Sequence, residues 1–548
     1  MSVFEHAAAS FDPTPSSVLL WTRLSEDMTW ASWTLARDPE LTDVVASGGA
    51  STGPDRDHTV VVDVGDLEPA TTYWYRFMAG EELSPVGRTR TLPVSPVDCF
   101  RIGTACCARY SVAPLGVYRA LAEREVDLVL HLGDYIYEDA GEKGPRDHDP
   151  PHTAITQDDY RRRLAQVRSD PDAQALHLRH PMVAIWDDHD LSDNAWREGA
   201  KHHDPARHGP WPVRVAAAAA ARQEWLPQRL RDEADPKITW RSIPIGDLAE
   251  LILLDTRLVG RDRQAGDEEG PPLDDPARSL LGDEQRAWAR ERLLDASRPW
   301  AIVASGVVVN SIELPWPRPL TSMNRLLPNG YAMLDGRVMH DDQWDGYPAE
   351  RERLVSWIVE RAAAGGRTVL LSGDVHSSWA FTGPADPATG EPAAVEFTTP
   401  AVSSAAMGRA HYPGLWRVLD RAADELDHVV WSDVTERGYT ILEVRPHEVR
   451  SEWWFAHPYD EDPAATAELA SAFVTERAAW PPSLDRREDA AEDPSRPGLP
   501  EPLPDRPGDL TSVRRRRMAR LTAEGAGLTT VIGAALCVTA YAIRRRLR

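Results

Sequence analysis

Hydrophobic and polar positions follow two different patterns along this 548-residue chain. Up to about residue 95, short segments of β-forming residues, such as VLLWTRL, TWASWTLAR and TTYWYRFMA, lie between turn residues. From about Cys99, continuous apolar runs such as VDLVLHLGD, LAELILLDTR and RTVLLSGDVH alternate with helical stretches. Continuous apolar runs suit strands that are covered on both faces, and their alternation with helices suggests layers. The pattern predicts an all-β domain over residues 1–95 and an α/β domain over residues 99–480.

One short motif refines the prediction for the first domain. Residues 67–73, LEPATTY, resemble the tyrosine corner of fibronectin type III sandwiches. In that corner a Tyr hydroxyl bonds back to the backbone a few residues upstream. We therefore interpret Tyr73, Trp74 and Tyr75 as corner and core residues rather than as ligand-binding residues, and we expect a small fibronectin- or immunoglobulin-like sandwich.

The pattern changes again near the C-terminus. Residues 481–513 are rich in Pro and acidic residues, which predicts an extended, disordered linker. Residues 525–543 then form a stretch of 19 residues without charge, just long enough to span a bilayer, with arginines on both sides. We expect residues 514–548 to hold a transmembrane helix that ties the protein to a membrane. A surface helix and an ordinary hydrophobic tail are the alternatives, and the flanking arginines leave the orientation open.

The net charge, the cysteines and the first residues of the chain limit which functions and locations we expect. The net charge of −25 argues against a nucleic-acid-binding surface, because no basic excess exists to neutralise phosphates. The four cysteines, Cys99, Cys106, Cys107 and Cys537, show no disulfide framework. The first residues lack the basic and apolar regions of a signal peptide, so we expect folded domain there.

The candidate chemistry lies where predicted strands end. Polar clusters follow five strand-like runs: Cys106-Cys107, Gly133–Glu138, Asp187–Asp190, Asp255–Arg257 and Gly373–His376. In open α/β sheets, ligands bind outside the carboxyl ends of the strands, so these clusters should converge. Carboxylates and imidazoles suit metal ions, and a thiolate or phenolate favours an ion such as ferric iron. Two bridged ions can clamp phosphoryl oxygens and activate water, which predicts a metal-dependent phosphoesterase.

At these positions the chain resembles a known family. GDYIYE, WDDHD followed by Asn194, LDTR and LSGDVHSSW are similar, in this order, to the motifs of PhoD-type alkaline phosphatases of the calcineurin-like metallophosphoesterase superfamily. TACC, WDGYPAERERL, EFTTPAVSS and RGYTILEV support the resemblance, which covers residues 1–460. It implies a layered α-β-β-α sandwich behind the fibronectin-like domain, and hydrolysis of phosphate monoesters or diesters. It also implies Fe³⁺ and Ca²⁺ as the metal pair, with Mn²⁺ or Zn²⁺ pairs as the alternative.

The resemblance carries roles to individual residues. The implied metal ligands are Cys106, Asp134, Tyr137, Asp188, Asn194, Asp374 and His376. Cys107 is the rival of Cys106, because both sit at the strand end. His189 is implied as the general acid beside the leaving group. Arg257 is implied as a phosphate contact, with a salt bridge to Asp255 or another acid as its plain alternative. Asp187 and Asp190 are candidates for orienting the ligands.

Two other functions compete with this hypothesis. One is a catalytically silent, membrane-tethered binding module on the same fold, which the intact ligand set argues against. The other is a hydrolase of a non-phosphate ester at the same metal site; no Gly-x-Ser-x-Gly elbow supports a serine esterase. The expected partners are a small phosphate ester or phosphodiester substrate and the membrane. Substrate identity and oligomeric state stay open.

Overall fold

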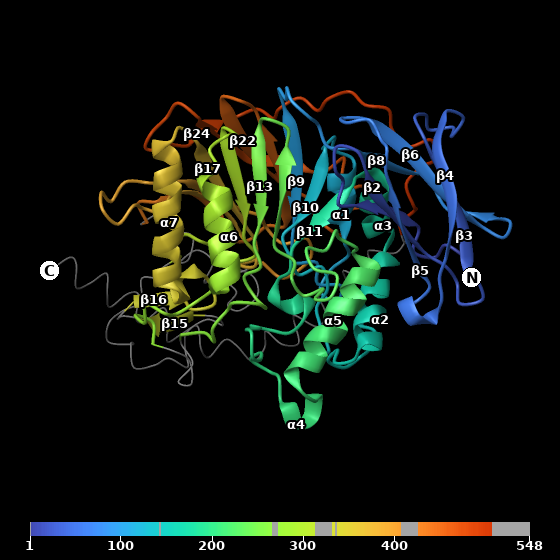
Figure 1. The fold of residues 1–548 in the computed structure, drawn as a ribbon, viewed down its shortest axis with the longest axis horizontal. Coiled ribbons are helices and arrows are strands. Elements are labelled where there is room, and N and C mark those ends of the chain that lie inside the picture. The colour runs from blue at the N-terminus through green and yellow to red at the C-terminus, as the bar shows by residue number, and fades with distance from the viewer. Residues whose placement is uncertain are drawn as a thin grey trace.

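The computed structural model describes residues 2–141, 144–265, 272–312, 331–334, 337–406 and 426–506. Within them, two large sheets pack face to face and carry helices on their outer faces (Figure 1). The N-terminal strands β3, β4 and β6 lie at the end of the molecule opposite α7. This arrangement is the predicted layered α/β domain with a β-rich domain beside it.

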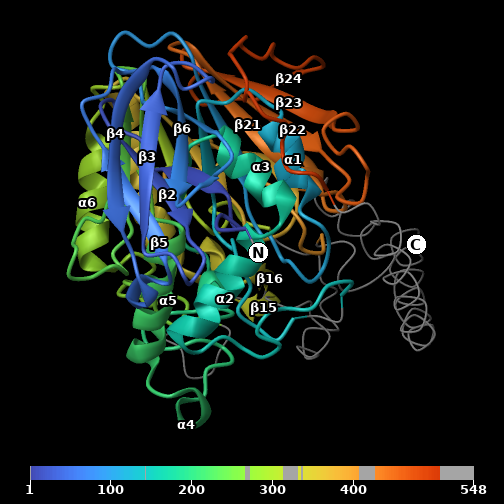
Figure 2. The same ribbon diagram turned by 90° about the vertical axis from the view of Figure 1, so that its right-hand side faces the viewer.

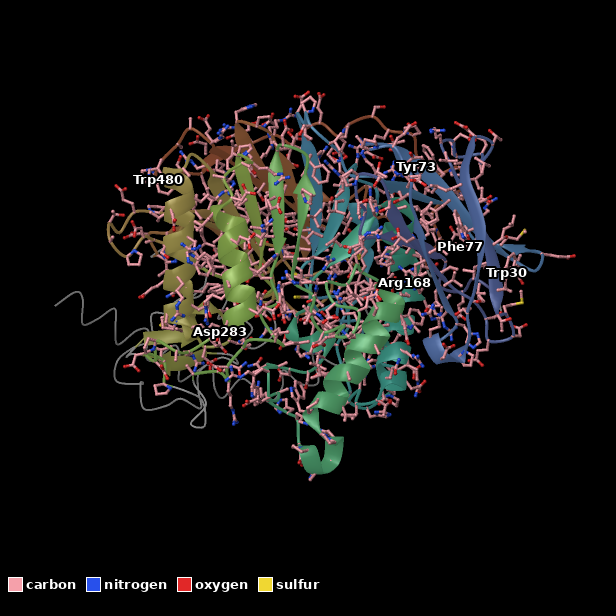
Figure 3. All side chains as sticks on the ribbon, viewed as in Figure 1. Trp30, Tyr73, Phe77, Arg168, Asp283 and Trp480 are labelled. Atoms are coloured by element: carbon pink, nitrogen blue, oxygen red, sulfur yellow. The ribbon has the colours of Figure 1, made fainter. Side chains whose placement is uncertain are left out.

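The N-terminal domain is a sandwich of short strands. Its strands are β1 Ala8–Phe11, β2 Val18–Arg23, β3 Trp30–Ala36, β4 Val44–Ser51, β5 Thr59–Val64, β6 Thr72–Ala79, β7 Glu82–Leu83 and β8 Gly87–Arg90. Strands β3, β4, β6, β7 and β8 form a sheet of their own, which packs on β1, β2 and β5. Alternate residues of β6, including Tyr73 and Phe77, point into the core between these two layers, while Trp30 is half exposed on the outside (Figure 3). The backbone N–H of Glu68 donates to the Tyr73 hydroxyl at 2.9 Å, which confirms the predicted tyrosine corner.

The larger sheet joins both parts of the chain. Its order is β24-β23-β22-β21-β9-β10-β11-β1-β2-β5. Its remaining strands are β9 Phe100–Ala105, β10 Leu128–His131, β11 Met182–Ala184, β21 Gly438–Val444, β22 Glu448–Phe455, β23 Glu468–Glu476 and β24 Asp485–Arg487. β1 pairs with β11 in parallel through Phe11 and Met182. The N-terminal sandwich is therefore not a structurally separate unit, since its strands β1, β2 and β5 extend the larger sheet.

The second sheet has the order β12-β13-β14-β17-β19-β18-β20. Its strands are β12 Arg241–Ile245, β13 Ala249–Leu253, β14 Trp300–Ala304, β17 Arg367–Ser372, β18 Ser378–Thr382, β19 Val395–Thr398 and β20 Val429–Asp433; a separate hairpin comprises β15 Tyr331–Leu334 and β16 Arg337–His340. Strand side chains alternate between faces, so Leu128 and Leu130 enter the core between the sheets while Val129 packs under the outer helices. Continuous apolar runs are thus explained by burial on both faces.

Helices cover the outer face of each sheet. In the described ranges they are α1 Gly116–Ala122, α2 Gln157–Arg168, α3 Pro171–Arg179, α4 Pro205–His208, α5 Trp211–Trp225, α6 Gly282–Leu294 and α7 Pro348–Ala363, and 3₁₀ turns span Pro54–Arg56, Asp188–Asp190 and Trp344–Gly346. α1, α2, α3 and α5 pack on the larger sheet, and α6 and α7 pack on the second. Figure 2 shows α6 on the side of the molecule away from β22 and β23. The predicted α-β-β-α order is therefore present.

The C-terminal segment from β24 to residue 506 runs over both domains. Arg101 donates to the Glu492 carbonyl at 3.1 Å, Trp74 Nε1 donates to the Gly498 carbonyl at 2.9 Å, and Arg506 pairs with Asp172. The segment is extended as predicted, but the prediction of disorder is wrong for this part, because its polar groups find partners on the folded surface. We call residues 485–506 the strap.

In the part of the chain that the structure describes, no helix has both the length and the apolar character needed to cross a bilayer. The predicted membrane tail, residues 514–548, lies outside the described residues.

Candidate metal centre

Parallel strands bring the polar clusters to one edge. β9, β10 and β11 are parallel neighbours in one sheet, and β13, β14 and β17 are parallel neighbours in the other. Asp134 follows β10, Asp187 follows β11 and Asp374 follows β17. Side chains after these strands therefore meet between the carboxyl ends of both sheets, as the sequence predicts.

Among the described residues, ligand-type atoms lie within 4.8 Å of one another in four groups. Two of these groups contain His189, with Asp134 and Asp188 or with Glu138 and Asp139. The other two are Cys107, Asp134 and His376, and Asp134, Asp187, Asp188 and Asp374. Asp134 belongs to both of the last two groups. The buried oxygens Asp134 Oδ2 and Asp187 Oδ2 have no hydrogen-bond partner, and Asp188 Oδ1 has only an ion pair with Arg257 at 3.4 Å. Buried carboxylate oxygens are costly without a partner, so the donor set fits cations.

The backbone at this edge is strained. Five non-glycine residues adopt positive φ: Cys107 (58°), Asp134 (56°), Asn194 (51°), Asp374 (65°) and His376 (53°). Such conformations cost free energy and persist where the surrounding structure enforces them, commonly at functional sites. Gly133 has a φ of 101°, and a Cβ there would lie 2.4 Å from the Asp187 Cβ, so only Gly lets the two strand ends approach.

The two cysteines face different surroundings. Both belong to the core between the sheets, but the Cys106 thiol contacts the carbonyls of Thr399 (3.4 Å) and Pro400 (3.6 Å). Cys107 instead joins Asp134 and His376. The predicted preference for Cys106 disagrees with this geometry. The reason is local: the left-handed turn at Cys107 ends the strand alternation, so the second cysteine, not the first, faces the site.

Tyr137 and His376 lie together at the same group. The Tyr137 hydroxyl is 3.0 Å from His376 Nε2, and His376 Nδ1 is 3.1 Å from the Ala405 carbonyl. With its Nδ1 proton donated to that carbonyl, His376 presents the Nε2 lone pair to the site. Burial, with the positive charge of His189, lowers the pKa of His376 to about 3, so the ring is neutral, as a metal ligand must be.

His189 is held by a carboxylate that the sequence interpretation missed. Its Nδ1 lies 2.8 Å from Glu138 Oε2, and its backbone N–H donates to Asp134 Oδ1 at 3.1 Å. Burial works to lower the pKa of His189, but the charges of Asp188, Glu138 and Asp134 outweigh it and raise that pKa well above its usual value. The three carboxylates therefore favour the protonated form of the His189 ring. The motif GDYIYE already contains Glu138, but spacing alone does not reveal its partner.

Arg257 is completely buried and surrounded by carboxylates. Its guanidinium nitrogens contact Asp187, Asp188, Asp342 (2.7 Å) and Asp374 (3.2 Å). The structure thus favours the salt-bridge alternative over a phosphate contact, with acids other than Asp255 as partners. Asp255 does receive the Arg257 backbone N–H at 2.9 Å, along with two further backbone N–H groups of the same turn.

The remaining candidates hold the loops in place. Asp190 accepts the backbone N–H groups of Asp134, Tyr135 and Asp187 at 2.9–3.0 Å, so it organises two strand ends at once. The backbone N–H of Asn194 donates to Asp188 Oδ2 at 2.6 Å, which brings Asn194 beside the carboxylate group.

The carboxylate of Asp342 and the side-chain amide of Gln343 also lie at the site, and no sequence motif indicates them. Asp342 accepts from Arg257 and Gln264, and the side chain of Gln343 donates to Asp374. Both residues come directly before the WDGYP motif at 344–348. They lie in a polar stretch that resembles a surface loop, so no local pattern separates them from solvated residues.

The electrostatics of the group match a cation site. Burial raises the pKa of Asp134 well above its usual value, and the negative charges of Asp188, Asp190 and Asp374 add to this effect. Burial likewise raises the pKa of the Cys107 thiol and of the Tyr137 phenol. These anionic forms become favourable when positive charge enters the site.

A layered fold with such a site defines a metal-dependent phosphoester hydrolase. The family model described as "PhoD-like phosphatase" matches residues 102–453, and that of the "PhoD-like phosphatase, N-terminal domain" matches residues 1–93. The chain therefore belongs to the PhoD-like phosphatase family. It is 31% identical over 504 residues to "Alkaline phosphatase D" of Bacillus subtilis (strain 168), covering 86% of this chain and 81% of the relative. A solved structure titled "Structure of PhoD" superposes with a TM-score of 0.75 at 27% identity, covering 96% of this chain and 99% of the other.

Proposed function

We propose that this phosphatase uses two cations bridged by Asp134 to hydrolyse phosphate monoesters or phosphodiesters. The proposed ligands of the first cation are Cys107, Asp134, Tyr137 and His376. Those of the second are Asp134, Asp188, Asn194 and Asp374. One observation carries the proposal: Asp134 belongs to both groups of proposed ligands, and its buried Oδ2 lacks a hydrogen-bond partner.

The donor atoms support different ions at the two positions. A thiolate, a phenolate, an imidazole and a carboxylate together suit ferric iron, and a set of oxygen donors suits calcium. Fe³⁺ and Ca²⁺ are therefore our proposed pair, with Mn²⁺ or Zn²⁺ as the alternative. Cations bound here would neutralise phosphoryl charge and lower the pKa of a water molecule to about 7, which supplies the nucleophile.

The protein's own groups complete the reaction. We assign His189 as the general acid that protonates the departing alcohol, supported by its contact with Glu138 at 2.8 Å. We assign Arg257 to hold the carboxylates of Asp187 and Asp374 in position, because its donors are already engaged by them. In this proposal the phosphate charge is met by the cations rather than by Arg257.

The test uses the purified full-length protein. Elemental analysis gives its metal content, and turnover of 4-nitrophenyl phosphate and bis(4-nitrophenyl) phosphate is measured with and without chelator. We expect chelator-sensitive turnover and its loss in Asp134→Asn. Asp283→Asn is the control, since Asp283 lies on α6 with a side chain that is 99% exposed (Figure 3). Metal-loaded protein that turns over neither ester would instead favour the silent binding module.

We also propose that residues 514–548 anchor the enzyme to a membrane. The support is the charge-free stretch of 19 residues between two groups of arginines. The full chain should stay in the membrane fraction after an alkaline carbonate wash, and a chain ending at residue 506 should not. Release of both forms by the wash would exclude a membrane-spanning tail.

A further inference from the structure

The loop after β19 is tied to the metal centre at several points. Cys106 pairs with Ala401 as a parallel bridge, and the backbone N–H of Val402 donates to the Cys106 carbonyl at 2.9 Å. The backbone N–H of Ser404 donates to the Cys107 carbonyl at 3.1 Å. The carbonyl oxygen of the next residue, Ala405, accepts a hydrogen bond from His376 Nδ1 at 3.1 Å. Residues 401–405 therefore brace two proposed ligands through main-chain contacts.

Within this loop one side chain reaches a proposed ligand atom directly. Ser404 Oγ donates to the Tyr137 hydroxyl oxygen at 2.8 Å, and both residues are buried. The Ser404 carbonyl accepts from Arg437 Nε at 2.7 Å, which fixes the residue from the other side. The Tyr137 oxygen thus lies between the hydroxyl of Ser404 and His376 Nε2.

We propose that Ser404 is a positioning residue of the metal centre. Its hydroxyl donates a hydrogen bond to the Tyr137 oxygen, directs that oxygen towards the cation and sets how much electron density the oxygen gives to the cation. The inference rests on the proposed role of Tyr137 as a ligand. A hydrogen bond donated to a phenolate withdraws electron density from the oxygen and fixes its direction. Groups that orient metal ligands in this way typically contribute 10–100-fold to metal affinity or activity.

The neighbouring serine supplies a matched control. Ser403 is buried in the same loop, but its hydroxyl donates to the backbone carbonyl of Arg109 at 3.0 Å. Ser403→Ala removes one buried hydroxyl of the same loop whose hydrogen bond goes to a backbone carbonyl rather than to the Tyr137 oxygen; the Arg109 side chain, which lies over the Tyr137 ring, is left unchanged. Ser404→Thr keeps the hydroxyl and is the rescue variant.

Two readouts test the role of Ser404. The first is the absorption band of a phenolate bound to ferric iron, with Tyr137→Phe identifying it. Removing the hydrogen bond raises the filled phenolate orbitals, so Ser404→Ala should move the band to longer wavelength. The second is metal retention during titration with chelator, followed by elemental analysis. Ser404→Ala should lose metal roughly 10–100-fold more readily than the parent, and Ser403→Ala should match the parent.

The outcomes separate the two proposals. A parent protein that holds metal but shows no such band would overturn the ferric assignment, and metal retention would still decide the role of Ser404. A parent without metal would overturn the proposed metal centre itself. If Ser404→Ala matches Ser403→Ala in band position and in metal retention, or if Ser404→Thr fails to restore either while its melting temperature equals that of the parent, the inference about Ser404 is wrong.

Discussion

Glu138 offers the sharpest test of how the site handles a proton. Its two oxygens both act as acceptors: Oε2 faces His189 Nδ1 at 2.8 Å, and Oε1 receives the backbone N–H of Asp193 at 2.8 Å. Glu138→Gln keeps the size but replaces one acceptor by an NH₂ group. If the amide oxygen keeps the Asp193 N–H, the NH₂ faces His189 Nδ1, which is a donor in the protonated ring; if the amide turns, the NH₂ faces the Asp193 N–H instead. Neither donor can turn to water, since Glu138 is 2% exposed.

The size of the effect follows from these contacts. A hydrogen bond to a charged group contributes about 1.5–3 kcal/mol, and a buried donor left without an acceptor costs about 1–3 kcal/mol. If this loss falls on the orientation and protonation of His189, kcat should drop roughly ten- to a hundredfold, since 1.4 kcal/mol corresponds to tenfold. The loss should be larger for an alkyl phosphate than for 4-nitrophenyl phosphate, because a poor leaving group depends more on a general acid.

The control is another buried glutamate at a distance from the site. Glu350 on α7 pairs with Arg286 and is buried in the same way. Glu350→Gln should lower the melting temperature and leave kcat nearly unchanged. The reasoning fails if Glu138→Gln keeps the parent's kcat for the alkyl ester, or if both variants lose kcat equally at matched stability.

Three further predictions concern stability. A chain ending at residue 506 should keep the parent's melting temperature, whereas one ending at residue 484 loses the strap contacts and should melt several degrees lower; equal melting of both would show that the strap contributes nothing. Burial, with the charges of Arg23 and Arg168, lowers the pKa of His6 to about 3. Below about pH 6.5 the unfolded chain gains a proton at His6 that the folded chain does not, so the free energy of unfolding is highest above about pH 6.5 and falls as the pH drops towards 3. At pH 4.5 the loss is roughly 3 kcal/mol, and thermal melts should show His6→Phe gaining stability relative to the parent between pH 7.5 and 4.5. Tyr73→Phe removes the tyrosine-corner hydrogen bond and should cost about 1 kcal/mol in denaturant unfolding; an unchanged midpoint would contradict that role.

Much of the architecture follows from local patterns. Continuous apolar runs predict strands buried on both faces, and β10 shows why, since Val129 and Leu130 enter different cores. The tyrosine corner needs only residues that lie five apart, Glu68 and Tyr73, and is therefore readable from a short motif. Strand-end acids such as Asp134 are predictable for a similar reason: an Asp that closes a buried strand needs a partner.

The sequence by itself determined the strands and which strand ends carry ligand-type residues, because apolar runs and turn chemistry act over a few residues, and the family resemblance added the layer order. Only the tertiary structure decided which ligand-type side chains come together. The left-handed backbone at Cys107 turns that thiol, not Cys106, towards Asp134 and His376. The four carboxylates around Arg257 come from segments up to 187 positions apart, from Asp187 to Asp374, and their meeting point depends on how the two sheets stack. Local patterns carry no information about such distances, so the partners of Arg257, His189 and the strap emerge only in the folded chain.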